Sequence, residues 1–264
     1  MPEATPPTQR WKITIEYDGG PYHGWQKQKP HIATVQTAIE KALFQFCQQH
    51  ISVHAAGRTD AGVHAKAQIA HFDLSSHRDY TGYDICKAIN AHLLPNAIAI
   101  LKAEKVDDNF HARFGAKNKL YSYRIVHRCF KPVRDLGKVW HIRKLMDIDA
   151  MIQAAPALIG HHDFSSFRDS HCQAKSPVRT LDDLTITHFP YDDFGGTEII
   201  FDFKGQSFLH HQIRNMVGTL SLVGTGKWQP EEVKAALEAK DRKRGGPTAP
   251  PDGLYLIDID YTEK

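Results

Sequence analysis

The 264-residue chain has only four cysteines, and none of them forms a Cys-x-x-Cys pair. This scarcity argues against a disulfide framework and a structural zinc site, and it favours reduced thiols in the cytosol. No apolar run approaches the roughly 20 residues that a membrane-spanning helix requires. Residues 1–9 also lack the basic and apolar stretches of a secretion signal. We therefore expect a cytoplasmic protein with no membrane partner and a short disordered tail at residues 1–10.

Several catalytic signatures are missing as well. The chain contains no Gly-x-x-x-x-Gly-Lys-Ser/Thr, no Gly-x-Gly-x-x-Gly and no serine-hydrolase elbow. Histidine is frequent, at 17 residues, yet it occurs in neither a His-Glu-x-x-His nor a zinc-deaminase pattern. We therefore expect no cofactor and no metal.

Positive charge is concentrated in one stretch, although the net charge is only +3. Residues 111–144 hold ten lysines and arginines and one acid, Asp135, a local balance of +9. Such a concentration suits a polyanion such as RNA, although a solvated face would look the same. The aromatic residues that alternate with these charges favour base stacking. They are Tyr121, Tyr123, Phe130 and Trp140.

The hydrophobic pattern predicts the same order of elements twice. Residues 11–17 alternate apolar and polar side chains, as in a strand, and Thr34 is placed to cap a helix that runs to residue 46. The first half is completed by strands at 51–55, 67–72 and 98–106 and a helix at 83–94. The second half has strands at 120–127, 184–189, 198–204 and 254–261 and helices at 147–159, 208–222 and 231–239.

This order, β-α-β-β-α-β in each half, predicts an α+β fold. We expect two tandem ferredoxin-like halves with a central antiparallel sheet and a catalytic cleft between them. The N-terminal half would span residues 11–107 and the C-terminal half, with the basic stretch, residues 108–264.

One loop places an arginine and a carboxylate two positions apart, bracketed by Gly57 and Gly62. In an extended segment Arg58 and Asp60 point the same way, so both can face one cleft. A guanidinium nearby keeps a carboxylate ionised near neutral pH, as an anionic nucleophile requires. Charged pairs in loops are usually solvated and weak, so an incidental surface ion pair is the simpler interpretation of these residues alone.

Six blocks together resemble a known family. They are GRTDAGVHA (57–65), YDGGPYHGWQ (17–26), KLYSY (119–123), HDFSSF (162–167), FLHHQIRNMVG (208–218) and TAPPDGL (248–254). In content and order they are similar to the tRNA pseudouridine synthase A family over nearly the whole chain. Gln212 and Pro251 depart from the pattern only where the family itself varies.

The resemblance implies a cofactor-free isomerase that converts uridine to pseudouridine at positions 38, 39 and 40 of the tRNA anticodon stem-loop. It implies that Asp60 is the nucleophile and that Arg58 helps to hold the flipped-out nucleotide. Tyr121 would stack on the target base and Arg214 would pair with Asp60. It also implies a homodimer.

Two other interpretations remain open from the residues. A non-catalytic RNA-binding protein with tandem ferredoxin-like domains would account for the charge, but not for the Arg58 and Asp60 pair. A metal-dependent RNA hydrolase would use the histidines. Tyr121 and Tyr123 share one face of a strand, so both are also candidates for the core.

Overall fold

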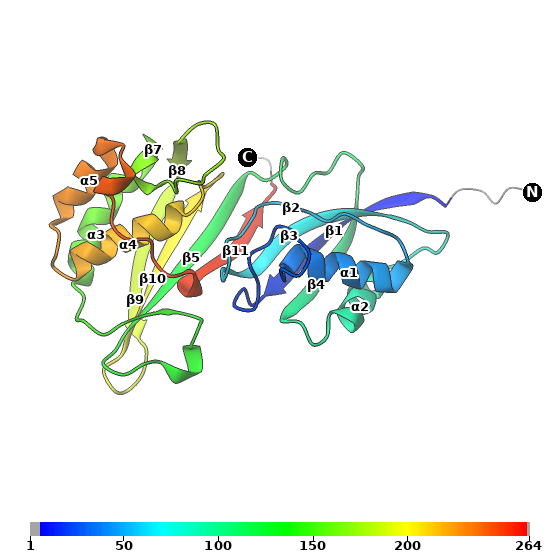
Figure 1. Ribbon diagram of the computed structural model, residues 1–264, viewed down its shortest axis with the longest axis horizontal. Helices are drawn as coiled ribbons and strands as arrows, with labels where there is room; N and C mark the ends of the chain where they lie inside the picture. Colours follow the sequence, from blue (N-terminus) through cyan, green and yellow to red (C-terminus); the bar gives the residue numbers. More distant parts are fainter. Residues whose placement is uncertain (1–5, 263–264) are drawn as a thin grey trace, which may run out of the picture. The chain divides into compact units, whose positions relative to one another are not determined.

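The computed structural model describes residues 6–262 (Figure 1), and the chain divides into two compact units. Unit 1 takes in the described residues up to Lys117 and those from Leu256 onward, and unit 2 is Asn118–Tyr255. The predicted halves, 11–107 and 108–264, are defined by a repeated order of strands and helices, whereas the two units are defined by compactness. The division into these halves therefore stays a prediction. Of the predicted tail, residues 1–5 lie outside the described part, and Thr8 to Arg10 already belong to a strand.

Unit 1 is built from antiparallel strands and two helices. Its elements are β1 (Thr8–Tyr17), α1 (Val35–Cys47), β2 (His54–Ala55), β3 (His64–Ser75), α2 (Gly82–Leu93) and β4 (Ile98–Val106). Strand β1 pairs antiparallel with both β3 and β4, and β2 pairs with β3. Because successive side chains of a strand point to opposite faces, β1 buries Trp11, Ile13 and Ile15 on one side.

Both helices of unit 1 begin at a capping threonine. The Thr34 side chain accepts a hydrogen bond from the Thr37 N–H at the start of α1, as the sequence predicts. Thr81 and Asp84 form a reciprocal capping box at the start of α2. Helix α2 packs on β4, and α1 lies beside α2 (Figure 1). These contacts bury Ile39 and Ile85 completely.

Unit 2 has a second antiparallel group of strands, with β10 between β5 and β9. Strand β6 adds to β5 in parallel, and β7 pairs with β8 in a separate two-stranded sheet. The strands are β5 (Asn118–His127), β6 (Trp140–Ile142), β7 (Gly160–Asp163), β8 (Val178–Leu181), β9 (Asp183–Pro190) and β10 (Thr197–Gly205). Strand β11 (Leu254–Asp260) carries the chain from unit 2 back into unit 1.

Three helices pack together in unit 2. They are α3 (Ile148–Ala154), α4 (Gln212–Gly224) and α5 (Pro230–Ala239). Helix α4 is buried on almost every side. A helix that is enclosed in this way is a rigid support for any side chain that it carries toward solvent. No helix among residues 6–262 is both long enough and apolar enough to cross a membrane.

The predicted strand at 51–55 is wrong for most of its length, because only His54 and Ala55 pair with β3. The backbone of Val53 is used by α1 instead. Its N–H donates to the Glu40 carboxylate at 3.2 Å, and its carbonyl accepts from the Gln36 amide at 3.3 Å. These side chains replace the ladder hydrogen bonds of a strand.

Two predicted helices have different bounds. The helix expected at 147–159 ends at Ala154 and continues as a 3-10 turn over Ala155–Leu158, where Pro156 has no N–H to donate. Helix α4 begins at Gln212 rather than at residue 208, because His211 has a left-handed backbone with φ of 60°. The short strands β6, β7 and β8 were not predicted.

A buried histidine of unit 1, His71, lies against the exposed His54 and the half-buried His111. The ring centroid of His71 lies 5.1 Å from that of His54 and 4.7 Å from that of His111. Burial lowers the pKa of His71 to about 4, and the charges of His111, His54 and Arg10 add to this effect. The Nδ1 of His71 accepts a hydrogen bond from the Ala112 N–H, as only a ring nitrogen without a proton can.

We expect His71 to make folding sensitive to acid. Its pKa in the folded state lies below the ordinary value of about 6.5, so its contribution is complete above pH 6.5 and is lost as the pH falls toward 4. Between pH 7 and pH 5 this costs up to about 2 kcal/mol of unfolding free energy. Urea unfolding at the two pH values should show a smaller loss for His71→Asn than for the wild type.

The matched control is His77→Asn, which replaces an exposed histidine of the same unit. It should lose as much stability on acidification as the wild type. Equal pH dependence in His71→Asn and the wild type would contradict the assignment.

Candidate functional site

The loop that carries Arg58 and Asp60 joins β2 to β3 in unit 1 and is bonded to the segment that follows β1. The Trp25 N–H donates to the Thr59 carbonyl at 3.1 Å, and the Gly62 N–H donates to the Tyr22 carbonyl at 3.2 Å. Gly62 has φ of 79°, a left-handed backbone conformation that glycine adopts readily. Two of the six sequence blocks, 17–26 and 57–65, therefore form one local structure.

This close approach depends on glycine at two positions. A Cβ on Gly24 would lie 2.7 Å from the Thr59 carbonyl oxygen, and one on Gly19 would lie 2.0 Å from that of Val63. Gly24 also has φ of +86°, a conformation that other residues rarely adopt. Any side chain at these positions pushes the 17–26 segment away from the loop.

The two charged side chains of the loop differ in exposure. Arg58 is exposed, whereas Asp60 is half-buried. Between them, Thr59 is buried, and its hydroxyl lies 2.8 Å from the Tyr17 hydroxyl. Burial raises the pKa of Tyr17 to about 12, although its hydrogen bonds with Thr59 and Gln68 lower it. The loop thus presents a cation and an anion on a buried support.

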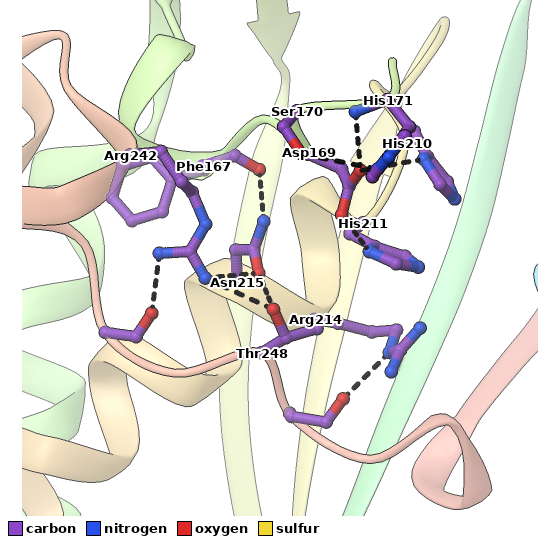
Figure 2. A network of polar contacts seen from close by, with 12 residues as sticks. Phe167, Asp169, Ser170, His171, His210, His211, Arg214, Asn215, Arg242 and Thr248 are labelled. Atoms are coloured by element: carbon purple, nitrogen blue, oxygen red, sulfur yellow. Dashed lines mark hydrogen bonds and ion pairs between the residues drawn. The ribbon is translucent and has the colours of Figure 1, made fainter.

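Arg214 lies on α4 of unit 2 and is held by the block at 248–254. Its Nε donates to the Ala249 carbonyl at 2.8 Å (Figure 2), and the Ala249 N–H donates to the Arg214 carbonyl at 3.1 Å. These two bonds fix the base of the guanidinium. A Cβ on Gly218, one turn further along α4, would meet the Pro247 carbonyl oxygen at 1.7 Å, so the two segments pack backbone to backbone.

The neighbour of Arg214, Asn215, is buried and is the centre of a polar network (Figure 2). Its Nδ2 donates to the Phe167 carbonyl at 2.8 Å, and its Oδ1 accepts from Thr248 at 2.7 Å and from Arg242 at 3.0 Å. The network joins blocks 162–167, 208–218 and 248–254. Buried polar groups that are fully hydrogen-bonded fix a single arrangement, so the position of α4 is well defined.

Tyr121 and Tyr123 lie on one face of β5, as predicted, but they differ in their surroundings. Tyr123 is fully buried, and its hydroxyl donates to the Pro250 carbonyl at 2.7 Å, so it belongs to the core. Tyr121 is also buried, at 8% exposure, and meets the edge of Phe208, with ring centroids 5.3 Å apart and planes at 82°. This contact orients the Tyr121 ring without covering it by a parallel stack.

An acidic residue that the sequence did not indicate lies at the start of α4. Asp169 accepts from the His171 N–H and from Nδ1 of His211, both at 2.8 Å, and lies 3.5 Å from Nδ1 of His210 (Figure 2). Partial burial raises the pKa of Asp169. The hydrogen bonds and the histidine charges lower it by more, so that this pKa is about 2. His210 and His211 are thus anchored to the 169–172 turn. No sequence pattern indicates that contact, because 41 residues separate Asp169 from His210.

The basic stretch at 111–144 is only partly available for a polyanion. Arg124 pairs with Glu198, and Arg128 pairs with Asp192. Lys131, Arg134 and Lys144 are exposed instead. Phe130 is also exposed, at 76%. A basic surface with an exposed aromatic ring can contact both phosphates and bases.

The four predicted site residues therefore fall into two groups. Arg58 and Asp60 share one loop of unit 1, whereas Tyr121 lies on β5 and Arg214 on α4 of unit 2. Residues that support them, such as Tyr17, Gln68 and Asn215, were not predicted. The one signal for Gln68 is a polar side chain between the apolar residues Ala67 and Ile69.

The sequence matches the family described as tRNA pseudouridine synthase over residues 13–115 and 154–262. Three curated relatives bear the name tRNA pseudouridine synthase A. The protein from Rhodospirillum rubrum is 48% identical over 252 residues, which cover 96% of this chain and 87% of the relative. That from Ehrlichia chaffeensis is 49% identical over 252 residues, covering 96% and 100%. That from Methylocella silvestris is 50% identical over 254 residues, covering 96% and 99%.

We expect Gly24→Ala to displace the loop. The added Cβ meets the Thr59 carbonyl, so the loss of unfolding free energy should reach about 2–4 kcal/mol. The control is Gly195→Ala, because Gly195 has φ of +85° and nothing within 4 Å of its Cβ position. That variant should lose only about 1–2 kcal/mol, the cost of the left-handed backbone alone. Equal losses in urea unfolding would contradict the argument.

Proposed function

This chain belongs to the tRNA pseudouridine synthase family, and we propose that it isomerises uridine to pseudouridine at positions 38, 39 and 40 of the tRNA anticodon stem-loop. Enzymes of this family are isomerases. The observation that carries the proposal is the hydrogen-bonded loop of unit 1, which carries the half-buried Asp60 two positions after the exposed Arg58.

Asp60 is the proposed nucleophile. The reaction breaks the bond between C1′ and N1, turns the uracil and rejoins it to the sugar through C5. A carboxylate that attacks the sugar or the base retains the fragment through a covalent adduct while it turns. The half-buried position of Asp60 supports this role, because an attacking oxygen must be reachable and yet held in place.

Arg214 is the proposed charge partner of Asp60. An arginine near a carboxylate favours its ionised form, whereas burial disfavours that form. The hydrogen bond from Nε of Arg214 to the Ala249 carbonyl fixes one edge of its guanidinium. This role is inferred from the family pattern in block 208–218.

Arg58 and Tyr121 are proposed to hold the substrate. A base inside a stem must be extruded before it can react, and the loss of stacking costs a few kcal/mol. The exposed Arg58 is suited to hold the displaced nucleotide, and the Tyr121 ring, oriented by Phe208, is suited to stack on the uracil. Neither role requires a cofactor or a metal.

The remaining parts of the proposal concern architecture and setting. We propose two tandem ferredoxin-like halves, at residues 11–107 and 108–264, with the catalytic cleft between them. We further propose that the protein is a homodimer and works in the cytoplasm. All four cysteines are free thiols, which is compatible with a reducing compartment.

We expect Asp60→Asn and Asp60→Ala to lower the rate of pseudouridine formation by about a thousandfold or more, because neither side chain can act as the nucleophile. Carbodiimide-based mapping of pseudouridine in tRNA measures this rate. The control, Asp193→Asn, removes an exposed carboxylate from the turn between β9 and β10 and should leave the rate unchanged. An Asp60 variant that converts uridine at the wild-type rate would show that another residue is the nucleophile.

Binding of tRNA should weaken steeply as salt rises. Each phosphate contact adds about 0.7–0.9 to the slope of log K against log salt. Replacing the exposed Lys131, Arg134 and Lys144 by alanine should therefore reduce that slope by about 2–3. The control replaces three exposed lysines on helices, Lys41, Lys87 and Lys234, and should not change it. A flat salt response in the wild type would exclude the basic stretch as the RNA surface.

A further inference from the structure

Three polar side chains are buried within or beneath the loop of unit 1, where apolar residues would be the ordinary choice. The exposed fractions are 3% for Tyr17, 7% for Thr59 and 0% for Gln68. Tyr17 ends β1, and Gln68 lies on the neighbouring β3, with a bulge in the pairing between Ile15 and Tyr17. Burying such groups is costly unless they are hydrogen-bonded, so their partners indicate what they do.

A series of hydrogen bonds connects β3 to the loop. The Nε2 of Gln68 donates to the Gly57 carbonyl at 2.9 Å and to the Tyr17 hydroxyl oxygen at 3.4 Å. The Tyr17 hydroxyl lies 2.8 Å from Oγ1 of Thr59. Because an amide nitrogen can only donate, the Tyr17 oxygen accepts from Gln68, whereas either hydroxyl can be the donor between Tyr17 and Thr59.

The two ends of this hydrogen-bond series bind the loop at the residues on either side of Arg58. Gln68 holds the backbone of Gly57, and Tyr17 holds the side chain of Thr59, the residue before Asp60. The backbone carbonyl of Thr59 is held separately by the Trp25 N–H. With the residue before Arg58 and the residue after it both fixed, the backbone that directs Arg58 and Asp60 has little freedom.

Glutamine at position 68 is unfavourable for stability. Its Oε1 is buried and has no hydrogen-bond partner among the described residues. An unsatisfied buried oxygen costs about 1–3 kcal/mol, which an apolar side chain of similar size would avoid. Stability alone therefore does not account for glutamine at this position, whereas a donor aimed at the loop does.

We propose that Tyr17 and Gln68 are positioning residues of the active site, which act through Thr59 and Gly57 to hold Asp60 and Arg58 in the reactive arrangement. This inference rests on the proposed function, because it assigns Asp60 and Arg58 to the reaction. Neither Tyr17 nor Gln68 touches the substrate in this scheme. Their loss changes the rate of the chemical step rather than the affinity for tRNA.

The test compares kcat and KM for tRNA in variants that remove single polar groups. Tyr17→Phe removes one oxygen, Gln68→Met keeps the length of the side chain, and Thr59→Val keeps its shape. Each should lower kcat by about 10–100-fold while KM stays within about threefold, since a small misplacement of a reacting group has effects of this size. Thr59→Ser, which keeps the hydroxyl, should recover most of the kcat that Thr59→Val loses.

The double variant Tyr17→Phe with Gln68→Met adds a sharper criterion. Residues that act through one chain of hydrogen bonds are not additive, so the double variant should lose little more kcat than the worse single variant. The matched control is Tyr261→Phe, which removes a tyrosine hydroxyl bonded to the Ala112 carbonyl in the same unit. It should leave kcat and KM within about twofold of the wild type.

The outcomes distinguish the positioning role of Tyr17 and Gln68 from the proposed function of the protein. Unchanged kcat in Tyr17→Phe and Thr59→Val overturns the positioning role, as does a higher KM with unchanged kcat. If Gln68→Met does not fold, the tyrosine and threonine variants decide the question. A wild-type protein that forms no pseudouridine would refute the proposed function itself, before any variant is compared.

Discussion

The approach of the 17–26 segment to the Arg58 and Asp60 loop is the constraint on which the rest of unit 1 depends. It needs two positions without a side chain, Gly19 and Gly24, and it is closed by hydrogen bonds between the two backbones. A loop of this length would otherwise sample many conformations, and ordering it would cost about 1–2 kcal/mol per residue. The loop is already ordered when the protein folds, so this entropy is not lost again when substrate binds.

Unit 2 follows the same principle with different elements. Arg214 is carried by a helix that is buried on almost every side, and its guanidinium is anchored to the Ala249 carbonyl. Asn215 ties that helix to the turns on either side of it. In both units a charged side chain reaches outward from a support that is buried and hydrogen-bonded. This is the arrangement that a precisely placed reactive group requires.

Much of the fold followed from periodicity, and the departures have physical causes. Alternation predicted most of β1, and Thr34 correctly marked the start of α1. Residues 51–53 failed as a strand because side chains of α1 satisfy the Val53 backbone, a contact that no local pattern encodes. The strands of three or four residues in unit 2 are too short to show any period.

The candidate site was predictable only where motifs are local. Arg58 and Asp60 stand two positions apart, so their shared loop could be read directly. The supports could not be: Gln68 reaches Gly57 across 11 residues, and Asp169 reaches His211 across 42. Pairings of this kind depend on the tertiary fold, and propensity does not indicate them.

The central claim is that this scaffold isomerises uridine in the anticodon arm. The most direct test is to treat an unmodified tRNA transcript with the purified protein and to map pseudouridine at every uridine. The account predicts new pseudouridine at uridines 38, 39 and 40 and at no other position. Absence of pseudouridine, or its formation only outside the anticodon stem-loop, would contradict it.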